Sequence, residues 1–123
     1  MTVHWEILET TEFAAWFEAL TRKQQAAVIE RANCLRERGP LLNRPLADRV
    51  HSSRHHHMKE LRVSSAGAIR ILFAFDPLRR AVLLWGGDKA EGSRWNEWYE
   101  VAVPIADNIF DRHLREMERD DDK

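Results

Sequence analysis

The stretch MKELRVSSAGAIRILFAFDPLRRAVLLWG, which spans residues 58–86, contains three runs of β-forming residues separated by short turn-forming segments. The runs are MKELRV at 58–63, AIRILFAF at 68–75 and AVLLWG at 81–86. The segments between them contain Ser, Gly, Asp and Pro, and strands joined by such short turns run antiparallel to each other. The sequence therefore predicts a three-stranded antiparallel meander at the centre of the fold.

The middle run divides its side chains between the two faces of this sheet, because successive residues of a strand point in opposite directions. The apolar set consists of Ile69, Ile71, Phe73 and Phe75. We expect this apolar face to pack against helices. Arg70 then emerges on the opposite and more open face of the sheet.

Upstream of the meander, the sequence predicts one strand and two helices. Residues 3–8 alternate apolar and polar side chains, which is typical of a short strand. Apolar residues at helical spacing predict a first helix over about residues 11–20. Thr21 and Gln24 form a capping-box pattern that starts a second helix, and Gly39 supplies its C-terminal stop.

Downstream of the meander, the spacing of Trp95, Trp98, Tyr99 and Ala102 predicts a short helix that Pro104 interrupts. Apolar residues between 105 and 117 predict a last helix. Residues 40–57 have no clean period and predict an irregular connection.

The order of these elements predicts an α+β domain. We expect a small antiparallel sheet, with the N-terminal helical hairpin and the C-terminal helix packed on one face. The chain has 123 residues, which is an ordinary size for one domain. We expect that domain over residues 1–118, followed by a frayed charged tail at 119–123.

The composition excludes several classes of protein. The chain is 44% hydrophobic and 32% charged, with 5 Gly and 4 Pro, which excludes collagen and low-complexity disorder. No apolar run approaches the ~18 residues of a membrane span, and the N-terminus does not read as a signal peptide. The single Cys34 cannot form an internal disulfide and suits the reducing cytoplasm.

Positive charge is concentrated in the middle of the chain. Residues 36–80 contain ten Lys or Arg against four Asp or Glu, although the net charge of the whole chain is -1. This block is either a footprint for a polyanion or a solvated positive face.

Metal and covalent chemistry are not favoured by the sequence. His55, His56 and His57 are adjacent and point apart, and a metal site needs ligands that converge. Cys34 falls near the buried stripe of the second helix, where a thiol is usually structural. We therefore expect no metal and no cofactor.

A set of cations offers a different chemistry. Its members are Lys59, Arg62, Arg70, Arg79, Arg80 and Lys89, with Tyr99 downstream. RNA cleavage without a metal needs a base for the 2′-hydroxyl, a cation for the phosphate and an acid for the leaving oxygen. Lys59 and Arg62 should lie on opposite faces of a regular strand, and Glu60 is expected to pair with Arg62 or Arg70.

Six motifs support a resemblance to a known family. They are RPLAD (44–48), SRHHHMKELR (53–62), IRILFAFDP (69–77), GGDK (86–89), WNEWY (95–99) and PIAD (104–107). In this order the motifs resemble the phage-derived branch of the RelE/HigB toxins, within the RelE/ParE superfamily. The resemblance implies a RelE-like fold and the toxin of a type II toxin–antitoxin system. It further implies a cytoplasmic endonuclease that cleaves mRNA on the ribosome without a metal.

The resemblance also implies partners and residue roles. The partners are mRNA, the ribosome and a cognate antitoxin with a helix-turn-helix domain; operator DNA is bound only through the antitoxin, and no membrane is involved. The catalytic candidates are Arg70, Lys59, Arg62, Lys89, Tyr99 and His57. The RNA-binding candidates are Arg54, His55, Arg79 and Arg80.

Two alternatives stay open. The same fold could carry a non-catalytic toxin like those of the ParE branch, which act on DNA gyrase. It could also be an inactive module that only binds its antitoxin. The insertion-like stretch AEGSRW at 90–95 departs from the simplest RelE pattern and bears on the role of Tyr99.

Overall fold

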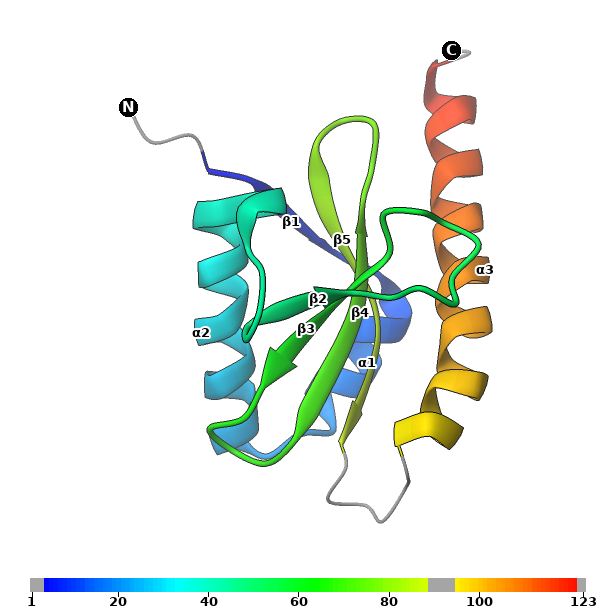
Figure 1. The fold of residues 1–123 in the computed structure, drawn as a ribbon. Helices are drawn as coiled ribbons and strands as arrows, with labels where there is room; N and C mark the ends of the chain where they lie inside the picture. Colours follow the sequence, from blue (N-terminus) through cyan, green and yellow to red (C-terminus); the bar gives the residue numbers. More distant parts are fainter. Residues whose placement is uncertain (1–3, 89–94, 122–123) are drawn as a thin grey trace.

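A computed structural model describes residues 4–88 and 95–121 of the chain. It contains a five-stranded sheet between helices, and α2 and α3 stand on opposite sides of that sheet (Figure 1). The strands are β1 (Glu6–Glu9), β2 (Ala47–Arg49), β3 (Lys59–Val63), β4 (Ile69–Phe75) and β5 (Arg80–Asp88). The helices are α1 (Thr11–Glu18), α2 (Arg22–Arg38), the short 3-10 helix η1 (Gly39–Leu41) and α3 (Trp95–Asp121).

The strand order in the sheet is β1-β5-β4-β3-β2. The predicted meander is confirmed, because β3, β4 and β5 pair antiparallel in sequence. The α+β class is also confirmed, but the sheet is mixed rather than purely antiparallel. Strand β1 pairs parallel to β5, with Leu8 opposite Val82. The helices and strands between β1 and β5 supply the long connection that parallel pairing requires.

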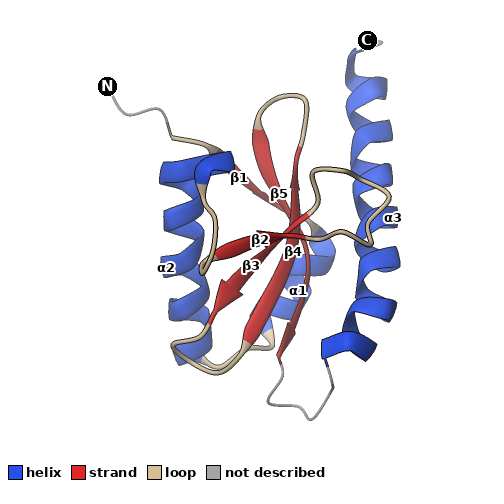
Figure 2. Ribbon diagram, in the orientation of Figure 1, coloured by secondary structure: helices blue, strands red, loops and turns tan. Residues whose placement is uncertain are grey.

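The prediction that all helices pack on one face is wrong. Helices α1 and α2 cover the face that carries Ile69, Ile71 and Phe73, as expected. Helix α3 covers the other face, so the strands lie between two helical layers (Figure 2). That second face carries Leu72, Ala74, Val82 and Leu84. An apolar face of this size must be removed from water, and α3 provides the cover.

Helix α3 is one continuous helix in which Pro104 lies without ending it. The predicted interruption is wrong because Ala102, Val103 and Ala106 pack into the core on the buried side, while Pro104 faces outward. The helix continues to Asp121, so the predicted domain boundary at residue 118 falls inside it. No described helix has a stretch long and apolar enough to cross a membrane.

The predicted helix starts are confirmed by their caps. The hydroxyl of Thr10 accepts a hydrogen bond from the backbone N–H of Phe13 at 3.2 Å. Thr21 and Gln24 form the reciprocal capping box, with bonds of 3.0 and 3.1 Å. These local contacts fix where the helical hairpin begins and turns.

Two glycines near the end of β5 bring helices from both layers against the strand. A Cβ atom on Gly86 would come within 2.5 Å of the Trp16 ring of α1. A Cβ atom on Gly87 would come within 2.3 Å of the Trp98 ring of α3. Gly87 therefore lets the start of α3 approach β5 closely, and Tyr99 directly follows Trp98 in that helix.

Candidate functional site

Two arginines lie side by side on the face of the sheet that α3 covers. Arg62 of β3 and Arg70 of β4 are directly opposite each other in the antiparallel ladder. Glu60 lies two residues before Arg62 on the same face, and Tyr99 reaches this carboxylate from the first turns of α3. We call Glu60, Arg62, Arg70 and Tyr99 the arginine–tyrosine site.

Glu60 is the centre of a hydrogen-bond network in this site. Its side chain is only 6% exposed, so its negative charge needs partners. The carboxylate accepts bonds from Arg62 Nε and Nη2 at 3.0 and 2.9 Å, and from the hydroxyl of Tyr99. Arg62 also donates to Asp48 at 3.2 Å. The expected pairing of Glu60 with Arg62 is present in the structure.

Tyr99 is held in its protonated form. Burial raises the pKa of this phenol most strongly, and the hydrogen bond to Glu60 and its negative charge raise it further. The charge of Arg70 acts in the opposite direction, but the net shift is upward. The hydroxyl therefore keeps its proton at neutral pH and is available as a proton donor.

Arg70 has no carboxylate partner among the described residues. Its guanidinium donates one bond to the Ile69 carbonyl at 3.2 Å and lies 5.2 Å from the centroid of the Trp95 ring. The ring orients the cation without neutralising it, because a cation–π contact supplies no formal negative charge. Arg70 thus carries an uncompensated charge beside the Glu60–Arg62 pair.

A cavity of about 390 Å³ opens next to these side chains. It is lined by Asp48, Arg49, Val50, His51, Ser52, Glu60, Arg62 and Tyr99. We call it the first cavity. Among the histidines that the structure describes, His51 is the one that lines it, and the sequence pattern drew attention to the His55–His57 triplet instead.

The position of His51 is set by anchored neighbours. Val50 is buried and its N–H donates to the Met58 carbonyl at 2.9 Å. Ser53 donates through its hydroxyl to Asp107, a buried carboxylate of α3. His51 is exposed between these two fixed points, and no hydrogen bond or ion pair engages its ring within the described parts of the chain. It is therefore a free imidazole held at the edge of the cavity.

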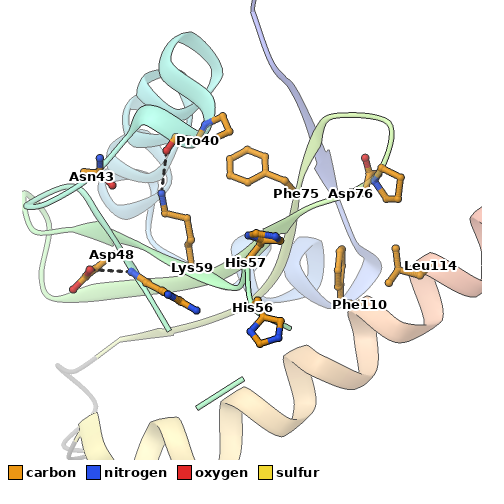
Figure 3. A pocket seen from close by; sticks show the side chains of 12 residues that line it. Pro40, Asn43, Asp48, His56, His57, Lys59, Phe75, Asp76, Phe110 and Leu114 are labelled. Atoms are coloured by element: carbon orange, nitrogen blue, oxygen red, sulfur yellow. Dashed lines mark hydrogen bonds between the residues drawn. The ribbon is translucent and has the colours of Figure 1, made fainter. Parts of the chain in front are cut away.

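A second and larger cavity, of about 850 Å³, holds His57 and Lys59 (Figure 3). Lys59 donates from Nζ to the carbonyl of Leu42 at 2.9 Å and to that of Pro40 at 3.4 Å. Burial lowers the pKa of this amine. Lys59 pairs with Phe73 in the sheet, whereas Arg62 pairs with Arg70, so the predicted separation of Lys59 and Arg62 onto opposite faces is confirmed.

The predicted catalytic residues are therefore divided. Arg62, Arg70 and Tyr99 come together, whereas Lys59 and His57 line the second cavity. Lys89 lies outside the described residues.

Arg54 and His55 are engaged with α3. Arg54 donates to Asn108 at 3.2 Å and forms an ion pair with Asp111. His55 Nε2 lies 2.8 Å from the other oxygen of Asp111. Burial acts to raise the pKa of the Asp111 carboxyl, but the contacts with His55 and Arg54 outweigh it and lower the pKa. These two side chains tie the loop before β3 to the helix.

Arg79 and Arg80 lie at the β4–β5 hairpin turn. Arg79 adopts a left-handed backbone conformation with φ of 63°, and its guanidinium lies 5.0 Å from the centroid of the Trp5 ring. Arg80 donates from Nε to Asp76 at 2.8 Å, and His113 of α3 lies at the same distance from that carboxylate oxygen. Asp76, Arg80 and His113 form what we call the hairpin cluster.

The described residues contain no group of three His, Cys, Asp or Glu side chains placed to hold a metal ion.

Comparisons with known proteins identify relatives. The sequence profile of the family described as "Phage derived protein Gp49-like (DUF891)" matches residues 15–111. Two proteins of Mycobacterium tuberculosis that carry the toxin names HigB2 and HigB3 are similar in sequence. HigB2 is 43% identical over 112 residues, which cover 89% of this chain and 55% of HigB2. HigB3 is 51% identical over 99 residues, which cover 80% of this chain and 84% of HigB3.

The chain thus spans about half the length of HigB2 and most of HigB3. Among solved structures, the crystal structure of the toxin–antitoxin complex RelBE2 from Mycobacterium tuberculosis contains a chain of similar fold. The TM-score is 0.57 at 22% identity, over 73% of this chain and 97% of the other. This likeness supports the RelE-like fold predicted from the sequence.

Proposed function

We propose that this chain, which belongs to the phage-derived Gp49-like family, is the toxin of a toxin–antitoxin pair and cleaves RNA without a metal ion. One observation carries the proposal. Arg62, Arg70 and Tyr99 come from three separate segments and meet beside a buried carboxylate at the edge of a cavity. The toxin names of two relatives support the biological role.

The proposed mechanism begins with the phosphate. Arg70 binds the scissile phosphate because its planar guanidinium can donate two parallel hydrogen bonds to phosphate oxygens. Its position on a central strand and its contact with Trp95 leave little ordering to be done on binding. Arg62, held by Glu60 and Asp48, adds positive potential where negative charge develops in the transition state.

Two proton transfers complete the reaction. His51 takes the proton of the 2′-hydroxyl, whose oxygen then attacks the phosphorus atom. The bond from phosphorus to the 5′-oxygen breaks, and Tyr99 gives its proton to that oxygen. The products are a 2′,3′-cyclic phosphate and a 5′-hydroxyl. Tyr99 suits the acid role because its raised pKa keeps it protonated until a strongly basic alkoxide forms.

We further propose that the substrate is mRNA on the ribosome and that a cognate antitoxin with a helix-turn-helix domain holds the toxin inactive. The antitoxin would also provide the contact with operator DNA. The concentration of Lys and Arg in residues 36–80 suits an RNA substrate, because phosphate contacts dominate affinity for nucleic acids.

The test is inducible expression in a bacterial host, followed by mapping of mRNA 5′ ends. We expect growth arrest with new 5′-hydroxyl ends inside translated regions. The purified protein should cleave RNA on ribosomes in the presence of a chelator for transition-metal ions. Such a chelator leaves the magnesium that keeps ribosomes intact. Growth arrest without RNA cleavage would assign a non-catalytic toxin instead. The absence of both effects would assign an inactive binding module.

A further inference from the structure

The second cavity adjoins the first. Asp48 and Arg49 line both of them, because β2 forms the wall that the two cavities share. A strand of RNA whose scissile phosphate lies at Arg62 and Arg70 would meet this wall as it leaves the first cavity. The second cavity is therefore placed to receive a neighbouring part of the same strand.

The charges that line the second cavity favour an anionic ligand. Its two carboxylates are already neutralised inside the protein: Asp48 pairs with Arg44 and Arg62, and Asp76 pairs with Arg80 and His113. Arg49 has no ion pair within the described ranges 4–88 and 95–121. Lys59 uses Nζ on two carbonyl oxygens, and its ammonium charge is not cancelled by that contact. The lining therefore offers the positive charges of Arg49 and Lys59 to a ligand.

Apolar side chains form much of the rest of the lining. Pro40 lies beside Lys59, and the others are Phe75, Pro77, Phe110 and Leu114. Figure 3 shows His57 between Lys59 on one side and Phe110 on the other, so the cationic and apolar parts of the lining face a common space. A nucleotide has this same division, with an apolar base face and an anionic phosphate.

We propose that the second cavity binds a nucleotide of the substrate RNA adjacent to the cleaved bond. The base lies on the apolar lining, and its phosphate binds Arg49 and Lys59, with His57 at the edge. Lys59 and His57 thus bind the substrate strand rather than transfer protons. The inference rests on the proposed ribonuclease function and adds to it a second, non-reacting subsite.

The experiment measures binding of a 2′-O-methyl RNA nonamer, which cannot be cleaved because the attacking hydroxyl is blocked. Fluorescence anisotropy at several salt concentrations gives the affinity and its salt dependence. For single-stranded nucleic acid, log K falls with log salt by about 0.7 for each phosphate contact. Lys59→Gln should lower the affinity roughly tenfold and reduce the slope by about 0.7.

The matched control is Lys23→Gln, the same change at an exposed lysine on α2. It should leave the affinity and slope at their wild-type values. His57→Gln provides a second variant. His57 is exposed and lies before β3, so its replacement does not disturb the strand. It should weaken binding by a smaller factor, about two- to fivefold, and the melting curve of each variant should match the wild type.

The outcomes distinguish the proposed ribonuclease function from the proposed nucleotide subsite. Wild-type protein that neither cleaves RNA nor binds the nonamer would overturn the proposed function and the subsite together. Wild-type protein that cleaves RNA, while Lys59→Gln and His57→Gln bind the nonamer with unchanged affinity and slope, would overturn the subsite alone. Variants that lose only their binding to an antitoxin would likewise overturn it, because the cavity would then hold a protein segment.

Discussion

Two buried carboxylates, Glu60 in β3 and Asp76 in the turn after β4, each bind an arginine but do different things. Glu60 and Asp76 are 4% and 5% exposed. The Asp76 carboxylate accepts hydrogen bonds from the backbone N–H groups of Leu78 and Arg80 and from the Arg80 guanidinium. It also contacts the His113 ring. Every group in that hairpin cluster is satisfied by another group of the same turn or of α3.

The arginine–tyrosine site differs in one respect. Glu60 satisfies Arg62 and Tyr99, but Arg70 stands beside them next to an aromatic ring and pairs with no acid among residues 4–88 and 95–121. A cation next to a saturated network, at the edge of a cavity, can accept an external anion without first breaking an internal ion pair. Both the hairpin cluster and the arginine–tyrosine site contain arginine, so positive charge alone does not identify a functional cation. Arg70 is distinguished because no carboxylate among the described residues pairs with it.

The variant with the largest expected effect on activity is Arg70→Ala. Loss of one donor to a developing anion lowers catalysis by about 100- to 1000-fold. We expect that loss in the rate of RNA cleavage and a matching loss of growth arrest. The unfolding transition should stay near that of the wild type, because Arg70 has no ion pair among the described residues. Its contacts are a hydrogen bond to the neighbouring Ile69 carbonyl, the Trp95 ring and the Tyr99 side chain.

The matched control for this variant is Arg115→Ala, at an exposed position on the outer side of α3. It should keep full activity. An Arg70→Ala protein that folds and still arrests growth at full strength would place the reaction elsewhere on the molecule.

The converse change is Asp76→Asn, which should affect stability and not the chemistry. The amide can still accept from the backbone N–H groups, but the charge that offsets Arg80 and His113 is removed. Removing one partner of a buried pair costs roughly 3 kcal/mol, and the partial exposure of Arg80 reduces this to about 2 kcal/mol. Denaturant unfolding should show this loss, while cleavage measured well below the melting temperature should be within about twofold of wild type.

The part of the fold that follows from local chemistry could be predicted from the sequence. The Thr21–Gln24 capping box and the meander depend on residues a few positions apart. The side of the sheet that α3 covers depends on distant packing, and so does the parallel pairing of β1 with β5. Strand β2 has only three residues, too few to show an alternating pattern.

The site divides in the same way. The meander register places Arg62 opposite Arg70, and the strand period separates both from Lys59. The engagement of Arg54 and His55 by Asp107 and Asp111 joins residues more than fifty positions apart, which no local pattern could show. That engagement also exposes His51 at the first cavity. To identify His51 as a residue of the first cavity, one would have had to predict that Asp107 and Asp111 of α3 bind the loop before β3.

A smaller effect tests whether His51 is the proton acceptor. Replacement by Gln keeps a polar side chain of similar size but removes the group that can take a proton. We expect the cleavage rate to fall about 10- to 100-fold. Single-turnover cleavage at neutral pH measures this rate.

His4→Gln, at an exposed position before β1, is the control and should keep the wild-type rate. If His51→Gln also retains the wild-type rate, the proton acceptor is a different group, and the arginine–tyrosine site would need another base at its edge.

The smallest expected effect concerns the response of the hairpin cluster to acid. Burial acts to raise the pKa of Asp76, but the bonds from His113 and from Arg80 outweigh it and hold the folded pKa below its usual range. A depressed folded pKa means that the ionised carboxylate stabilises the native state above the unfolded pKa, which is about 3.9. That stabilisation is lost as the pH falls below about 4 towards the lower folded pKa. The difference in unfolding free energy between wild type and Asp76→Asn should therefore be constant from pH 7 to about pH 5 and shrink below pH 4. Denaturant unfolding at pH 7, 5 and 3 measures this difference directly.

A difference that is the same at all three values would mean that the charge of Asp76 does not stabilise the hairpin, and the contrast with Glu60 would then rest on geometry alone.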